Sequence, residues 1–394
     1  MKQIVKRVLF DLLRRAVWDI PIGDEVKQYL KEDTKQDTPT LMPMVYDLAK
    51  KHDLAHLVSV GLSREGLLSL WQNAPEGTQG RALYDKLYRQ ESLAVYRFEC
   101  QHHTLDVLCQ ALTEQGIDHL PLKGVVLCEK YPKPWMRTGC DIDLLVRPCD
   151  IDKACACLTN TLKCQPRKGD IHSHDRGFLT DNGVAIELHF ALQDPLWKTY
   201  DILDDVWTYA KEDIANPYAF VMPPEMFYFY HLTHMAKHIA GGGCGIRPFL
   251  DLFLMGEMPP ACQNWCEMYG LTTFAGCAYH LAEVWFGGGE HTPLSQDLEA
   301  YVLEGGVYGN LDNRVQVQPQ ISFWRKVFLP YEQLKYRYPV LQKHKWLTPL
   351  FEVVRWFAVL LGGGISRNSK EHTARKTYQG RDVSHLLSDL GIEG

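Results

Sequence analysis

The sequence predicts an α+β fold, in which a small mixed β-sheet lies between an N-terminal and a C-terminal helical region. Apolar residues three and four positions apart dominate the chain up to about residue 95 and again after residue 222. Between these regions, short apolar runs are separated by turn residues, a pattern typical of strands. We therefore expect three parts: a helical region at 1–95, an α/β domain at 96–222 and a helical domain at 223–394.

The N-terminal part contains helical runs such as TLMPMVYDLAKKHDLAHLVSVGL and SREGLLSLWQNA. A longer helix is predicted over residues 92–116, where Gly116 is a suitable residue to end it. Two strands are predicted next, in the apolar runs 117–124 and 141–148, each followed by a helix, at 125–131 and 150–163. The runs SHDRGFLT and GVAIELHF flank Asp181-Asn182-Gly183, a strong signal for the tight turn of a β-hairpin.

After Pro223-Pro224 the pattern is helical again. EMFYFYHLTHMAKHIA predicts one helix, a glycine-rich break follows at 241–245, and a second helix runs from Arg247 to about Glu257. Residues 258–330 are expected to be mostly helical, with a loop or short strands in GGVYGNLDNRVQVQPQIS. The apolar stretch 347–364 contains Glu352 and Arg355 and is too short to cross a bilayer, so it predicts a buried or amphipathic helix.

The overall composition excludes several classes of protein. With 46% hydrophobic and 11% aromatic residues among 394, the chain can bury a core and is not disordered as a whole. Its 42 Lys and Arg residues against 48 Asp and Glu give a net charge of -6, which excludes a general basic surface for nucleic acid.

The cysteines and the first residues indicate a cytoplasmic protein. None of the closest pairs among the 12 cysteines, Cys155-x-Cys157 and Cys262-x3-Cys266, has CxxC spacing, so we expect buried free thiols rather than a metal site or disulfides. The first residues, MKQIVKRVLFDLLRRAVWD, have helical periodicity, and Asp11 and Arg14 interrupt any signal-peptide core.

The segment DIDLLV carries the most informative pair of polar residues. In a strand, Asp141 and Asp143 point to one side, whereas Ile142, Leu144 and Val146 point to the other. Two neighbouring carboxylates repel each other unless a cation lies between them. Oxygen ligands alone favour Mg²⁺ or Mn²⁺, so we expect Asp141 and Asp143 to be metal ligands.

A third carboxylate comes from VAIELHF. Its apolar residues alternate along one face, which leaves Ala185, Glu187 and His189 on the other. If this strand lies beside DIDLLV, then Glu187 completes a cluster able to hold two metals for phosphoryl or nucleotidyl transfer. Glu187 is then also a candidate general base.

Positive and flexible residues that suit phosphate binding precede the acidic strand. Lys123-Gly124 stands at a predicted strand end where a helix begins, and such a helix start can bind phosphate through backbone N–H groups. Arg137 lies four residues before Asp141 and could reach the same phosphates.

These motifs together resemble a known family. LPLKG, Tyr131, Arg137, DIDLLV and IELHF resemble the polymerase-β-type nucleotidyltransferase superfamily, and more closely its bacterial branch of uncharacterised nucleotidyltransferases. HLTHMAKH, the Arg247–Asp251 helix, FLPYEQLKYRYP and WLTPLFEVVRW are also similar to that branch. The resemblance implies a nucleotidyltransferase core that uses Mg²⁺ or Mn²⁺ and moves a nucleoside monophosphate from an NTP to an acceptor hydroxyl or phosphate. It also implies a cleft role for Arg247, Asp251 and His189 beside the nucleotide.

Several residues have a second interpretation. Arg247 and Asp251 are four apart and could form an intrahelical ion pair. His189 could simply be packed. His231, His234 and His238 lie on one helical stripe and could be core residues, line the cleft or bind zinc, although the glutamate of an HExxH motif is missing.

Two other functions remain open. Lys123-Gly124 stands where the wider superfamily has Gly-Ser, so the domain could be a nucleotide-binding or regulatory module without transfer activity. The His231 helix and His174-Asp175 could instead belong to a metal-dependent phosphohydrolase. The acceptor, which could be a sugar phosphate, a small molecule, tRNA or a protein side chain, is not fixed by the sequence.

Overall fold

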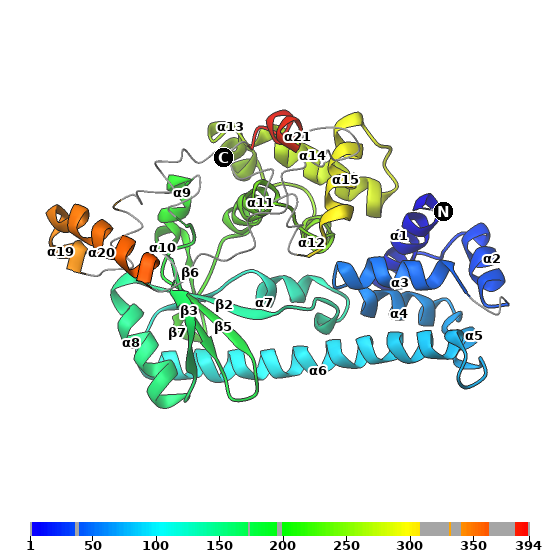
Figure 1. Cartoon of the computed structure of the whole chain (residues 1–394), viewed down its shortest axis with the longest axis horizontal. Helices are drawn as coiled ribbons and strands as arrows, with labels where there is room; N and C mark the ends of the chain where they lie inside the picture. The colour runs from blue at the N-terminus through cyan, green and yellow to red at the C-terminus, as the bar shows by residue number, and fades with distance from the viewer. Residues whose placement is uncertain are drawn as a thin grey trace.

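The structure is a computed structural model that describes residues 2–35, 39–171, 174–194, 199–307, 331, 340–361 and 383–392. It has the predicted α+β architecture: a mixed sheet, with helical regions that precede and follow it in the chain (Figure 1). The N-terminal helices are α1 (Lys2–Trp18), α2 (Asp24–Asp33), α3 (Leu41–Lys51), α4 (Ala55–Arg64) and α5 (Leu68–Gln72).

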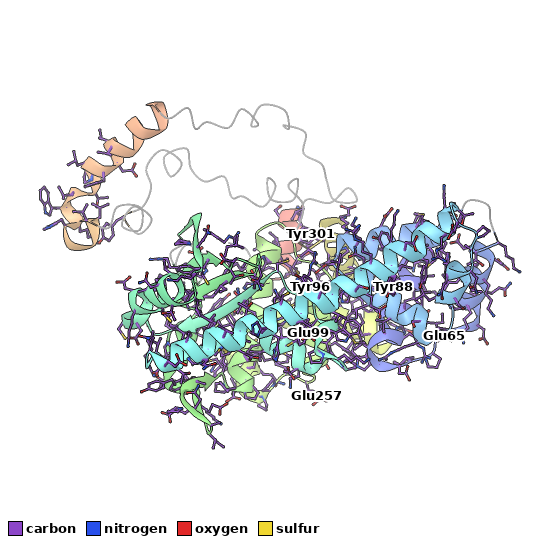
Figure 2. The ribbon with its side chains drawn as sticks, turned by 90° about the horizontal axis from the view of Figure 1, so that it is seen from below. Glu65, Tyr88, Tyr96, Glu99, Glu257 and Tyr301 are labelled. Atoms are coloured by element: carbon purple, nitrogen blue, oxygen red, sulfur yellow. The ribbon has the colours of Figure 1, made fainter. Side chains whose placement is uncertain are left out.

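The long helix α6 (Gln79–Glu114) joins the N-terminal helices to the sheet. Figure 1 shows it running from α5 beneath α3 and α4 to the strands, and Figure 2 shows it crossing the face seen from below, with Tyr88, Tyr96 and Glu99 along it. The helix begins 13 residues before the predicted start at 92, since Thr78 caps it by accepting a hydrogen bond from the Arg81 backbone N–H. It crosses residue 95 without a break, and Gly116 follows its end with φ +62°.

The sheet has seven strands in the order β3-β4-β5-β2-β1-β7-β6. The predicted strands are present as β1 (His119–Pro121), β2 (Asp141–Val146), and the hairpin of β4 (Asp175–Leu179) with β5 (Ala185–His189). Strand β2 pairs in parallel with β5 and antiparallel with β1.

Three further strands were not predicted: β3 (Gln165–Ile171), β6 (Lys211–Asp213) and β7 (Asn216–Val221). Strands β3 and β6 are the two edges of the sheet, and β7 lies between β1 and β6. The edge strands β3 and β6 are polar, and β3 includes Pro166, because strands at a sheet edge bury little and tolerate proline.

Short helices connect these strands. They are α7 (Gly124–Leu127), η1 (Cys128–Lys130), η2 (Pro134–Met136), η3 (Pro148–Asp150), α8 (Ile151–Ala156), the π-turn η4 (Cys157–Thr161), α9 (Asp201–Asp204) and α10 (Val206–Tyr209). One hydrophobic core lies between α6, α8 and the sheet, where Leu108 and Leu112 pack with the apolar side of β2 and β5. Ile142, Leu144, Ile186 and Leu188 are fully buried there, which confirms the predicted apolar faces and fixes the register of both strands.

The C-terminal helices are α11 (Pro224–Ala240), α12 (Arg247–Met255), α13 (Pro260–Met268), α14 (Thr272–Ala282), the π-turn η5 (Glu283–Gly287) and α15 (Pro293–Gly305). Together with the N-terminal helices they form a second, larger core. The structure then describes α19 (Val340–Lys343), η6 (Lys345–Leu347), α20 (Thr348–Leu361) and α21 (Val383–Asp389). The predicted loop or strands after Gly305 lie outside the described residues from 308 onward.

The predicted late helix is α20, and Glu352 on it is buried whereas Leu350 and Val353 are exposed. Among the described residues, no helix has the length and apolar character needed to cross a membrane. All 12 cysteines are described and none forms a disulfide. Cys157, Cys262 and Cys266 are buried thiols, as predicted, whereas Cys155 is half-buried.

Candidate active site

The acidic cluster is built by two neighbouring parallel strands. Asp143 on β2 stands directly opposite Glu187 on β5, and Asp141 stands opposite Ala185. One ligand atom each from Asp143, Glu187 and His189 lie within 4.8 Å of one another, a spacing that could hold a metal ion. Asp141 is outside this close group but on the same side of β2. The structure thus brings the acidic residues of the two motifs together at the edge of one cavity.

That cavity has a volume of about 420 Å³. All nine residues predicted for the site line it: Lys123, Gly124, Arg137, Asp141, Asp143, Glu187, His189, Arg247 and Asp251. Helix α11 contributes a further wall that includes His234, Lys237 and His238. The cavity therefore lies between the acidic strands and the C-terminal helices.

The carboxylates differ in their affinity for protons. Burial, together with the charges of Asp143 and Glu187, raises the pKa of Asp141 from its ordinary value of 3.8 to about 6. Burial acts in the same direction on Asp143, but Lys123 and His189 outweigh it and hold the pKa of that carboxyl well below its usual range. The nearby His189 ring outweighs burial at Glu187 and lowers its pKa. Asp143 and Glu187 are therefore ionised at neutral pH. Asp141 is the carboxylate whose ionisation its surroundings oppose.

Lys123 reaches the acidic cluster directly. Its backbone takes φ +48°, a region rare for residues other than glycine, at the turn between β1 and α7. Its Nζ donates to Oδ1 of Asp143 at 2.6 Å, so the ammonium faces the carboxylate. Asp143 outweighs burial and raises the pKa of Lys123, which stays charged.

His189 lies in the same contact. Its Nε2 is 2.9 Å from Oδ1 of Asp143 and 3.7 Å from Oε2 of Glu187. The side chain is buried, and its Nδ1 has no hydrogen-bond partner among the described residues. Burial lowers its pKa, but the two carboxylates more than offset this and raise it, so they favour the protonated form of His189.

Arg137 pairs with the fully buried carboxylate of Asp251. Nη2 of Arg137 is 3.0 Å from Oδ2 of Asp251, and the Tyr131 hydroxyl donates to Oδ1 at 2.8 Å. Gly124 allows this arrangement, because a Cβ at that position would lie 2.2 Å from Nη1 of Arg137.

Arg247 and Asp251 do not form the intrahelical ion pair that was one of their two interpretations. Arg247 instead donates through Nη1 to Oδ2 of Asp53 and to the Thr138 carbonyl oxygen, both at 2.9 Å. A buried carboxylate needs the partner that is nearest in space, and the 134–138 segment brings Arg137 to Asp251 while the N-terminal helices bring Asp53 to Arg247.

Asp53 was not predicted as part of the site. It joins α3 to α4 with φ +56° and also accepts from the Thr138 hydroxyl at 2.8 Å. Beside it, Nε2 of His56 is 2.7 Å from the Met136 carbonyl oxygen. The N-terminal helices thus support one wall of the cavity. A helix break at Lys-His-Asp was the only sequence signal, and it carried no information about distance to Arg247.

The histidines of α11 do not share one role. Nε2 of His231 is 2.9 Å from the Pro248 carbonyl oxygen, which ties α11 to α12, and this buried side chain also lines the cavity. His234 and His238 contact each other, with their Nε2 atoms 2.9 Å apart. In the described ranges, neither belongs to a group of three residues spaced to bind a metal.

A second group with metal-ligand spacing lies at the start of β4. Ligand atoms of His174, Asp175 and His189 fall within 4.8 Å of one another, and Nε2 of His174 is 3.2 Å from Oδ2 of Asp175. It adjoins the acidic cluster through His189 and does not include the His231 helix.

Two comparisons with known proteins bear on this site. A family model described as "Uncharacterised nucleotidyltransferase" matches residues 40–287, a range that spans Asp53, the whole sheet and α12. No curated protein matches the chain.

Proposed function

The chain belongs to the uncharacterised nucleotidyltransferase family, and we propose that it moves a nucleoside monophosphate from an NTP to an acceptor hydroxyl or phosphate, with release of pyrophosphate. The observation that carries this proposal is the parallel pairing of β2 with β5, which sets Asp143 opposite Glu187 at the wall of a cavity. The family match supports a nucleotidyltransferase in general, and the acidic cluster supports dependence on a metal.

The residues at this wall fit Mg²⁺ or Mn²⁺. Asp141, Asp143 and Glu187 would hold the metal, since carboxylate oxygens are the ligands these ions prefer. The raised pKa of Asp141 is consistent with this assignment, because burial and then the charges of Asp143 and Glu187 oppose its ionisation more than Lys123 and Arg137 favour it. When bound, such ions stabilise the negative charge that develops on the transferred phosphoryl group and lower the pKa of the acceptor hydroxyl.

Side chains and backbone groups of the chain would accept the proton and contact the phosphates. Glu187, ionised at neutral pH, would accept the proton of the acceptor hydroxyl as its oxygen bonds to the α-phosphorus. The bond between the α-phosphorus and the bridging oxygen breaks, and pyrophosphate leaves with the electron pair. Lys123 and Gly124 would contact the phosphates, while Arg137 and Arg247, which are held by Asp251 and Asp53, would keep the cavity wall in place.

The test measures pyrophosphate release and transfer of label from each of the four NTPs, with Mg²⁺ or Mn²⁺ and a metabolite extract as the source of acceptors. We expect label on an extract component with the wild type, and a loss of about 100-fold or more when Asp143 becomes Asn, since an acidic ligand of the reacting centre is removed. Asp152→Asn, an exposed change of the same kind on α8, is the matched control. Equal transfer by the wild type and Asp143→Asn would refute the proposal.

One observation favours a second candidate, a nucleotide-binding module without transfer activity. Lys123 already neutralises Asp143 at 2.6 Å, so this carboxylate is satisfied without a metal. Such a module would show a thermal shift with NTP that Asp143→Asn reduces, but it would release no pyrophosphate under any of the tested conditions.

A further inference from the structure

Four lysine and arginine side chains line the cavity, and three of them are already neutralised. Each of the three pairs with a carboxylate: Lys123 with Asp143, Arg137 with Asp251, and Arg247 with Asp53. The fourth, Lys237 on α11, forms no ion pair with any residue that the structure describes. Of these four cations, it is the one that a ligand can bind without competing with a carboxylate that the structure pairs with it.

Lys237 is partly withdrawn from solvent. Burial lowers its pKa, and the positive charge of Lys123 acts in the same direction, whereas Asp194, Asp175 and Glu187 raise it. Its ammonium therefore lies within electrostatic reach of the acidic cluster without a partner of its own. A half-buried charge in this position costs free energy that an anionic ligand would offset.

Two imidazoles, those of His174 and His234, lie within electrostatic range of this ammonium. His234 precedes Lys237 by three residues on α11, and both line the cavity together with His174 from the start of β4. Burial, with nearby positive groups, lowers the pKa of His174 to about 3 and that of His234 well below its ordinary value. An uncharged imidazole can donate one N–H, and that of His234 suits the oxygens of a phosphate chain.

On the premise that the chain is the NTP-dependent transferase described above, we propose that Lys237, with His234, binds the polyphosphate of the NTP. The acidic strands then face the α-phosphate, and α11 holds the phosphates that leave as pyrophosphate. Arg137 and Arg247 on the other walls are paired with carboxylates, so their charge is neutralised. In this arrangement, α11 supplies the positive charge that binds the phosphates.

The test uses inorganic tripolyphosphate, which has no base, no sugar and no transferable nucleotide. Its affinity for the full chain is measured by titration calorimetry with Mg²⁺ present, for the wild type, Lys237→Met and Lys237→Arg. We expect Lys237→Met to weaken binding roughly tenfold to hundredfold, the value of one hydrogen bond to a charged group, and Lys237→Arg to restore most of it. Lys211→Met, on the exposed edge strand β6, removes the same charge away from the cavity and should leave the affinity unchanged.

The outcomes separate this site from the proposed reaction. Unchanged tripolyphosphate affinity in Lys237→Met, or no binding by the wild type, would overturn the site even where NTP transfer proceeds. An effect on orthophosphate alone would also overturn it, because it would assign Lys237 to a phosphate of the acceptor. Lys237-dependent tripolyphosphate binding in a protein that transfers no label would support the site and count against the transferase.

Discussion

Replacement of Asp141 by asparagine should stabilise the metal-free protein at neutral pH while weakening its response to Mg²⁺. The aspartate lies on β2 beside Asp143 and opposite the strand of Glu187, and burial with these two charges raises its pKa from 3.8 to about 6. Asparagine keeps the size of the side chain and removes its charge. The change therefore isolates the electrostatic cost of the acidic cluster.

The sign follows from the raised pKa. The folded state binds the Asp141 proton more tightly than the unfolded state, so this group's contribution to stability is lost as the pH rises from about 4 to about 6. A difference between 3.8 and about 6 corresponds to about 3 kcal/mol above pH 6, an upper bound for a partly exposed group. We expect Asp141→Asn to raise the free energy of unfolding by about 1–3 kcal/mol at about pH 7.5 and by little at about pH 4.

The assay is urea denaturation in a chelator at the two pH values, followed by the same measurement with millimolar Mg²⁺. Asp152→Asn on α8 is the control and should change stability by less than about 0.5 kcal/mol. Mg²⁺ should stabilise the wild type more than Asp141→Asn, since binding to the folded state alone raises stability. A variant that is less stable than the wild type at pH 7.5, or a difference that does not change with pH, would refute the reasoning.

Two further changes test the wall of the cavity. Gly124→Ala should lower the free energy of unfolding by about 1–3 kcal/mol, because the added Cβ would lie 2.2 Å from Nη1 of Arg137, and Arg137 cannot move without leaving Asp251. Urea denaturation measures this change, and an unchanged midpoint would contradict the prediction. Tyr131→Phe should lower the free energy of unfolding by about 1–3 kcal/mol at neutral pH, because it removes the 2.8 Å hydrogen bond to the buried Asp251 carboxylate. The control is Tyr88→Phe at an exposed tyrosine, and an equal loss of stability in both variants would show that this bond contributes nothing.

The local sequence was sufficient to predict a strand or a hairpin wherever alternating apolar residues or turn residues define it within a few positions. Ile142, Leu144 and Val146 can only be buried together on one side of a strand, which leaves Asp141 and Asp143 on the other. The turn Asp181-Asn182-Gly183 fixed the hairpin that carries Glu187 in the same way, with Gly183 at φ +83°. The edge strands β3 and β6 gave no such signal, since an edge strand needs little apolar surface.

The pairing of charges could not be read from spacing. Arg247 and Asp251 satisfy the helical rule for an ion pair, yet each contacts a residue more than 100 positions away in the chain. An exposed helical pair contributes only a few tenths of a kcal/mol, whereas a buried carboxylate without a partner costs several, so the buried contact prevails.

By itself, then, the sequence determined the α+β class, the strands that carry Asp141, Asp143 and Glu187, and the side of each strand on which these carboxylates lie. Only the tertiary structure decided that β2 runs beside β5, that Asp53 supports the site from the N-terminal helices, and that Lys237 remains without an ion pair among the described residues. The reason is physical: periodicity and turns act between neighbours in the chain, whereas desolvation and charge pairing depend on which groups the whole fold brings together.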